Sequence, residues 1–258
     1  MDYNLKIKKI AIEAAEEAGA ELLKRYDKFS RADIKLKSHH EILTAADLAA
    51  EKIIITKIKK NFPEHDFLSE EAGHRGLKSD YQWIIDPLDG TTNFSMHNPL
   101  WATSIGVAYR GKIVFGVVFA PFLDEIYTAE ISKGAKMNNK KIQVSKVGDG
   151  KVLNTFCHSS QEKDIKKAIK YHQKQKTEGF DCRQLGSASL ELAYVACGRI
   201  ESIVIPGANS WDVAAGVLLV REARGIVTDF KNEEWSLKSR DMMATNKVVH
   251  KQILKVLT

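Results

Sequence analysis

Two aspartates, Asp86 and Asp89, follow the apolar run Trp83-Ile84-Ile85 and are separated by a proline and a leucine. Ionised carboxylates at this spacing can each give an oxygen to a hard cation such as Mg²⁺. Pro87 fixes its own φ and keeps its peptide from continuing a strand ladder. A turn at this proline can therefore bring both carboxylates and a backbone carbonyl to one point.

The next three residues, Gly90, Thr91 and Thr92, extend this chemistry towards phosphate. Glycine permits close backbone approach or a positive φ, and the threonines offer hydroxyls and amides where a helix could begin. Residues 83–92 also fit a strand followed by an Asx turn and a helix cap. For an isolated Asp-Pro-x-Asp-Gly segment, that local explanation is the better one.

Three other acidic features occur elsewhere in the chain, and each has a local explanation of its own. Glu70 and Glu71 end another short apolar strand, where a solvated acidic pair is common. Thr44 and Asp47 form a capping box for the helix that follows them. Asp212 lies in the first turn of a helix, where the macrodipole favours an acid.

The combination of these segments resembles the inositol monophosphatase family of lithium-sensitive, magnesium-dependent phosphatases. The matching segments are Ser69-Glu70-Glu71, residues 83–94, Gly186-Ser187-Ala188 and Trp211-Asp212-Val213-Ala214-Ala215-Gly216, and the resemblance covers essentially the whole chain. It implies an α+β/α/β fold, a layered αβαβα sandwich, and usually a homodimer. It also implies two to three Mg²⁺ per active site and a small phosphorylated polyol or sugar as substrate.

The resemblance assigns a role to each matching position. Glu70, Asp86 and the carbonyl of Leu88 match the ligands of one metal. Asp86, Asp89 and Asp212 match those of a second, and Glu70 also borders a third. Asp47, Glu70 and Thr91 match the catalytic residues, and among them Asp47 and Thr91 match the pair that helps to activate the attacking water. The amides of Gly90 and Thr91 match phosphate donors. The positions expected to bind substrate are Asp89, Gly90, Thr91, Arg183, Ser187, Ala188, Ile205 and Asp212.

Departures from the family pattern concern the alcohol part of the substrate. Inositol-specific members have an acidic residue seven positions before the last metal aspartate, where this chain has Ile205. Isoleucine cannot accept a hydrogen bond from a hydroxyl, so we expect loose recognition of the alcohol. Arg183 fits a substrate contact and a surface or interface salt bridge equally well. In the loop before Asp47, Glu41 replaces a frequent aspartate, and Lys37 could lie near the third metal.

The remaining pattern predicts the elements that position these residues. Residues 30–43, with adjacent His39 and His40 as solvated loop residues, fit a mobile loop or a loose hairpin. A junction at 146–151 separates an N-terminal α+β half, 1–148, from a C-terminal α/β half, 149–258, within one compact catalytic unit. Helices are predicted at 4–26, 44–60, 160–175, 187–197 and 211–223. Strands are predicted at 66–69, 82–85, 102–109, 112–119, 125–130, 152–157, 179–184, 200–205 and 225–229.

Composition narrows the classes of partner. The 258 residues have a net charge of +6 with both signs dispersed, which is too diffuse to indicate nucleic-acid binding. The apolar runs are too short to span a bilayer, and the N-terminus does not resemble a signal peptide. The three cysteines lack metal-type spacing, and we expect reduced core thiols in a cytoplasmic protein.

The leading hypothesis is a Mg²⁺-dependent phosphomonoesterase acting on inositol 1-phosphate or a related polyol or sugar phosphate. Fructose-1,6-bisphosphatase, alone or as a dual activity, is the alternative. Histidinol-phosphatase and 3′(2′),5′-bisphosphate nucleotidase are less favoured. A binding protein that kept the fold and lost catalysis is a different class, although all the expected ligands are present. A P-loop hydrolase is excluded, because no Gly-x-x-x-x-Gly-Lys-Ser/Thr segment occurs.

Overall fold

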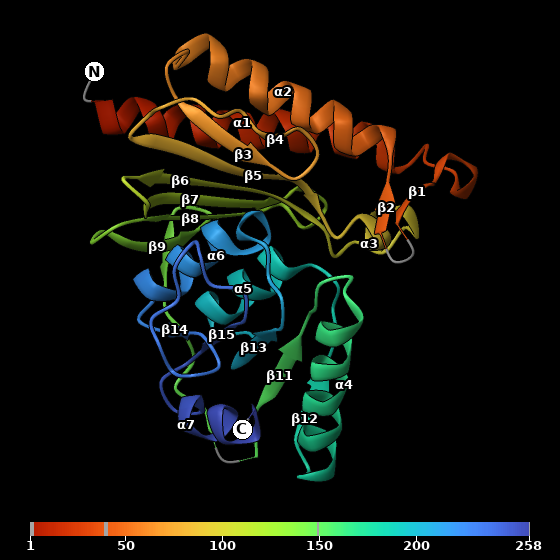
Figure 1. The fold of residues 1–258 in the computed structure, drawn as a ribbon, viewed down its shortest axis with the longest axis vertical. Helices are drawn as coiled ribbons and strands as arrows, with labels where there is room; N and C mark the ends of the chain where they lie inside the picture. The colour runs from red at the N-terminus through yellow and green to blue at the C-terminus, as the bar shows by residue number, and fades with distance from the viewer. Residues whose placement is uncertain (1–2, 39–40, 149, 258) are drawn as a thin grey trace.

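The computed structural model describes residues 3–38, 41–148 and 150–257, without the side chains of residues 33 and 35–42. Five layers alternate between helices and sheets (Figure 1). Helices α1 (Tyr3–Tyr26) and α2 (Ala45–Asn61) cover the outer face of an eight-stranded sheet, and α5 (Ala188–Cys197) and α6 (Ser210–Glu222) lie below its other face. A five-stranded sheet follows, with α4 (Glu162–Thr177) and α7 (His250–Leu257) beyond it. The predicted layered αβαβα fold is confirmed.

The large sheet has the strand order β10-β9-β8-β7-β6-β5-β3-β4, and all its neighbouring strands are antiparallel except β3 and β5. Its strands are β3 (Asp66–Ser69), β4 (Gly73–His74), β5 (Tyr81–Asp89), β6 (Ala102–Tyr109), β7 (Lys112–Ala120), β8 (Glu125–Glu130), β9 (Gly134–Met137) and β10 (Lys140–Ile142). Helix α6 lies very close to β7, because a Cβ added at Gly116 would be 2.9 Å from the Cα of Ala215. Glycine at this position therefore lets the helix layer approach the sheet.

The small sheet has the order β12-β11-β13-β15-β14. Its strands are β11 (Leu153–Phe156), β12 (Asp181–Arg183), β13 (Ser202–Ile205), β14 (Ile226–Thr228) and β15 (Met242–Thr245). β11 is parallel to β12 and β13, whereas β15 is antiparallel to β13 and β14. The carboxyl ends of three parallel strands thus meet at one edge, which is where α/β proteins usually bind ligands.

The segment predicted as a loop or loose hairpin contains two short antiparallel strands, β1 (Lys35–Ser38) and β2 (Glu41–Leu43). His39 and His40 lie outside the described residues, so their expected solvated position stays a prediction. The predicted boundary at 148/149 falls between the last strand of the large sheet and the first strand of the small one. In the described part of the chain, no helix is both long and apolar enough to cross a membrane.

Candidate active site

An irregularity in β5 brings the two central aspartates to the same side of the large sheet. Asp86 pairs with Ser104 of β6 and Asp89 pairs with Ala102, so three steps along β5 correspond to two along β6. The Oγ1 of Thr103 donates a hydrogen bond of 2.9 Å to the carbonyl of Pro87 inside this bulge. In a regular strand, residues three apart point to opposite faces, and a one-residue bulge removes that difference. Both aspartates are buried.

The pairing of β3 with β5 places Glu70 beside Asp86. The amide of Glu70 donates to the carbonyl of Ile85 at 3.1 Å, which continues the parallel ladder by one residue. The turn containing Glu70 is held by Glu51 of α2, which is 6 % exposed. Its Oε1 accepts hydrogen bonds from the Oγ of Ser69 and from the amides of Glu71 and Ala72, the latter two at 3.2 and 2.9 Å.

Sequence reasoning did not identify Glu51 as part of the site. The available signal was its position four residues after Asp47, because residues i and i+4 lie on one face of a helix. Helix α2 therefore contacts the site at two successive turns. Asp47 faces the segment that follows β5, whereas Glu51 faces the segment that follows β3.

Asp47 and Thr91 are in contact, as the resemblance implies. The Oδ2 of Asp47 accepts from the amide and the hydroxyl of Thr44 at 2.8 and 2.6 Å, which forms the predicted capping box. The Oγ1 of Thr91 lies 3.1 Å from the other oxygen, Oδ1, and 3.0 Å from the carbonyl of Leu88. Burial raises the pKa of Asp47 to about 6, against the opposing effect of these hydrogen bonds. Asp47 is thus suited to accept a proton near neutral pH.

Asp89 connects the two halves of the chain. Its Oδ2 accepts from the hydroxyl of Ser187 at 2.6 Å, and from the amide and the hydroxyl of Ser189 at 2.7 and 2.6 Å. Its Oδ1 accepts from the amide of Ala188 at 3.1 Å. The carboxylate therefore caps the start of α5 from a strand 98 residues earlier. Ser189 was missed from sequence, because nothing local to it indicates this contact.

Gly90 begins the short helix α3 (Thr91–Ser95) with φ of +89°. A Cβ at this position would be 2.9 Å from the carbonyl oxygen of Leu100 and 3.2 Å from the Cβ of Ser187. Both the backbone conformation and the available space therefore require glycine. This turn places Thr91 next to Asp47.

Asp86 is the centre of the negative charge. Burial is the largest cause that raises its pKa well above the usual range, followed by the charges of Glu70, Asp89, Asp212 and Asp47. Its Oδ1 accepts one hydrogen bond of 3.1 Å from the amide of Leu88. The groups that act most strongly on Asp86 after burial are thus all carboxylates. Such a set of oxygen donors is the kind that Mg²⁺ prefers.

Asp212 belongs to this set from the first turn of α6, where its Oδ2 accepts from the amide of Asn209 at 2.9 Å. Across residues 3–38, 41–148 and 150–257, no three acidic, imidazole or thiol side chains meet the spacing of a preformed metal centre. The oxygens of Asp89 instead face the hydrogen-bond donors of α5. The structure thus gathers the predicted ligands around Asp86 without closing them into a coordination shell.

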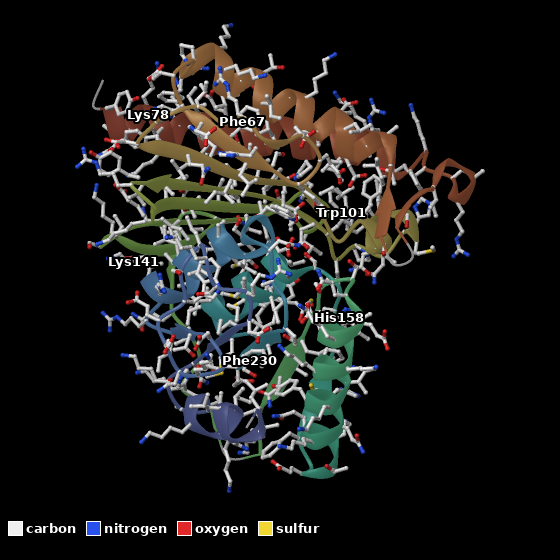
Figure 2. All side chains as sticks on the ribbon, in the orientation of Figure 1. Phe67, Lys78, Trp101, Lys141, His158 and Phe230 are labelled. Carbon is white, nitrogen blue, oxygen red and sulfur yellow. The ribbon has the colours of Figure 1, made fainter. Side chains whose placement is uncertain are left out.

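A cleft of ≈ 530 Å³ opens from these carboxylates towards the C-terminal half. Figure 2 shows His158 where the start of α4 meets the upper layers. The residues that line the cleft are Glu70, Asp89, Cys157, His158, Ser159, Ser160, Gln161, Gln184, Gly186, Ala188, Ile205, Asn209, Trp211, Asp212 and Arg240. His158 and Gln184 lie just beyond the carboxyl ends of β11 and β12, a position that could have suggested them.

The remaining predicted substrate residues have different surroundings. Ile205 ends β13, is 2 % exposed and belongs to the core, yet it also borders the cleft. Ser187 is buried against Asp89. Arg183 is not among the residues lining the cleft, and its guanidinium pairs with Asp181 at 3.1 Å. Its neighbour Gln184 borders the cleft instead. The side chains of Lys37 and Glu41 lie outside the described ones.

Comparisons with known proteins identify relatives that match nearly the whole chain. The Nus factor SuhB of Salmonella typhimurium strain LT2 is 39 % identical over 248 residues, which cover 95 % of this chain and 93 % of that protein. An inositol-1-monophosphatase of Mesorhizobium japonicum is 36 % identical and covers 96 % and 94 %, respectively.

Two solved structures are also similar over nearly their full length. The extragenic suppressor protein suhB from Bartonella henselae has a TM-score of 0.91 at 32 % identity, with 98 % of both chains covered. The inositol monophosphatase from Anabaena has a TM-score of 0.86 at 34 % identity, with 98 % and 96 % covered. The model of the inositol monophosphatase family matches residues 4–258, and this chain therefore belongs to that family of phosphatases.

Proposed function

We propose that this phosphatase hydrolyses monoesters of small polyols or sugars, with inositol 1-phosphate as the reference substrate, in a Mg²⁺-dependent reaction. The observation on which this rests is the group of carboxylates around the buried Asp86, three of which line a cleft. Fructose 1,6-bisphosphate is the alternative substrate. The homodimer that the resemblance implies remains part of the same proposal.

The donor set fits Mg²⁺ better than softer metals, because it contains carboxylate and carbonyl oxygens rather than thiolates or imidazoles. Glu70, Asp86 and the carbonyl of Leu88 would hold one ion. Asp86, Asp89 and Asp212 would hold a second, and Glu70 would border a third. When bound, Mg²⁺ supplies positive charge that neutralises phosphate and makes water more acidic.

The residues of the chain then orient and deprotonate the attacking water. The hydroxyl of Thr91 donates to Asp47 and has lone pairs left to accept a hydrogen bond from water. A proton leaving that water can pass through Thr91 to Asp47. The amides of Gly90 and Thr91 are the proposed donors to the phosphate. Because Asp47 is buried and fixed by Thr44, it keeps this orientation through the reaction.

The proposal is tested by measuring phosphate release from a panel of esters: inositol 1-phosphate, fructose 1,6-bisphosphate, histidinol phosphate and adenosine 3′,5′-bisphosphate. We expect release from the first or second after Mg²⁺ is returned to chelated protein. Lithium, titrated against sodium at fixed Mg²⁺, should inhibit if the family resemblance extends to this property.

Asp89→Asn should abolish turnover, whereas Asp80→Asn provides a matched loss of one charge. Asp80 lies outside the site and pairs with Arg110 at 3.0 Å. Full turnover in chelator, or turnover by Asp89→Asn equal to that of Asp80→Asn, would refute the metal-dependent mechanism. Binding of these esters without any phosphate release would indicate a binding protein instead.

A further inference from the structure

Arg240 lines the cleft just before the start of β15. Strand β13 ends at Ile205, which pairs with Met242 at the start of β15, so Arg240 precedes that pair by two residues. Both Ile205 and Arg240 line the cleft. The Nη1 of Arg240 is 3.4 Å from the Oδ1 of Asn209, which immediately precedes α6.

The carboxylates of Asp241 and Asp164 have other hydrogen-bond and ion-pair partners than Arg240. Asp241 accepts from Lys167 at 2.9 Å and from the amide of Gly207 at 3.1 Å. Asp164 accepts from the hydroxyl of Ser159 at 2.6 Å and lies 4.0 Å from the same lysine. Within the described part of the chain, Arg240 forms no ion pair with a carboxylate, and its hydrogen bond is to a neutral amide.

The lining of the cleft therefore carries charge of both signs. It contains three carboxylates, those of Glu70, Asp89 and Asp212, which are the groups proposed for Mg²⁺. Arg240 is the single lysine or arginine among the described residues that line it. The lining also contains the hydroxyls of Ser159 and Ser160. A volume of ≈ 530 Å³ is within the range of sites that hold whole small molecules.

The geometry points to a substrate with two anionic groups: a phosphate monoester whose alcohol part carries a second phosphate or a carboxylate, which Arg240 recognises. This inference rests on the proposed function, because it assigns the ester to the carboxylates of the same cleft. Ile205 contributes no negative charge that would oppose such a group. A planar guanidinium can bind phosphate or carboxylate through two parallel hydrogen bonds.

The test compares esters that differ in the second anion alone. One pair is fructose 1,6-bisphosphate and fructose 1-phosphate, and the other is 2-phosphoglycerate and glycerol 2-phosphate. For each pair, kcat/KM is measured for the wild type, Arg240→Gln, Arg240→Lys and the control Arg110→Gln. Arg110 is exposed and pairs with Asp80, so its substitution removes the same charge outside the cleft.

We expect Arg240→Gln to lower the ratio of the dianionic to the simple ester about tenfold, as for the loss of one charge-assisted hydrogen bond. Arg240→Lys should give an intermediate ratio, and Arg110→Gln should keep that of the wild type. A fall confined to the fructose pair identifies phosphate as the second group, and one confined to the glycerol pair identifies carboxylate. An unchanged ratio in both pairs, or an equal fall with Arg110→Gln, overturns the inference.

Dissociation constants of the same esters, from calorimetry on the same four proteins, give a readout that does not need turnover. If no ester is hydrolysed with Mg²⁺, the proposed function fails, and the ratio of dissociation constants still decides the role of Arg240. If all esters are hydrolysed and both ratios stay constant, the phosphatase proposal stands and the second-anion assignment fails. Melting temperatures of the variants show whether each one is folded.

Discussion

Replacing Glu51 with leucine should weaken the metal site without touching a proposed ligand. Glu51 is buried in α2, and a single oxygen, Oε1, accepts all three hydrogen bonds from residues 69–72. Glu70 lies in the middle of that turn. Leucine fills the volume but accepts no hydrogen bond, so the turn is free to move and Glu70 moves with it.

The size of the effect follows from the donors left behind. Ser69 is fully buried, and an unsatisfied buried donor costs about 1–3 kcal/mol. The amides of Glu71 and Ala72 are in a half-buried turn and add about 0.5–1.5 kcal/mol each. The total, about 2–6 kcal/mol, corresponds to a melting temperature lower by about 4–24 °C for a chain of this size. Loss of groups that orient metal ligands typically lowers metal affinity by about 10–100-fold.

The assay is phosphate release from inositol 1-phosphate as a function of Mg²⁺ concentration. Glu51→Leu should raise the Mg²⁺ concentration for half-maximal rate by about tenfold or more. Glu51→Gln should change it far less, because the amide oxygen can accept the same three hydrogen bonds. A folded Glu51→Leu protein with the wild-type Mg²⁺ dependence would refute the positioning role. Equal defects in both variants would show that the charge, rather than the acceptor, matters.

Three other outcomes are expected. Asp86→Asn should raise the melting temperature of the metal-free protein by several degrees, because it removes a buried charge surrounded by carboxylates. Asp89→Asn should not raise it, because the new amide nitrogen would face the amide of Ala188. Burial raises the pKa of Glu191 to about 7, so the folded state holds this proton more tightly than the unfolded state does. The free energy of unfolding should therefore fall by about 3 kcal/mol as pH rises from about 4.5 through 7. Denaturant unfolding of Glu191→Gln should lack this dependence on pH. Ile205→Glu should raise the kcat/KM of inositol 1-phosphate relative to fructose 1,6-bisphosphate a few-fold to about tenfold, and a constant ratio in a folded variant would contradict the assignment.

The parts of the fold that were predicted well have strong local periodicity. The first two helices were predicted within one residue of their observed ends, and β8 at its observed bounds. β15 and α7 were not predicted. β15 has four residues, and α7 has eight, which is short for a helical pattern. β9 and β10 are also short, and the pairing that defines them is not visible in their own sequence.

The residues of the candidate site could be predicted from sequence where they lie in a recognisable local motif. They could not be predicted where their position depends on contacts between segments distant in sequence. The residue types of the Asp86–Asp89 segment indicate a metal site, but the bulge that aligns the two carboxylates depends on pairing with β6. Ser189 and Arg240 reach the site from segments with no motif of their own. Their positions follow from how the two sheets pack around α5 and α6.

The local and functional explanations of the acidic residues turn out to be compatible. At Asp47, the capping hydrogen bonds use Oδ2, and this fixes the direction in which Oδ1 meets Thr91. The cap of α6 holds Asp212 by its Oδ2 in the same way. At Asp89, donors of α5 stabilise the charge directly. Asp86 has one such donor and is surrounded by acids, so it gains most from a cation. Binding of Mg²⁺ should therefore stabilise the fold chiefly through Asp86, and the increase in melting temperature with Mg²⁺ should be largely lost in Asp86→Asn.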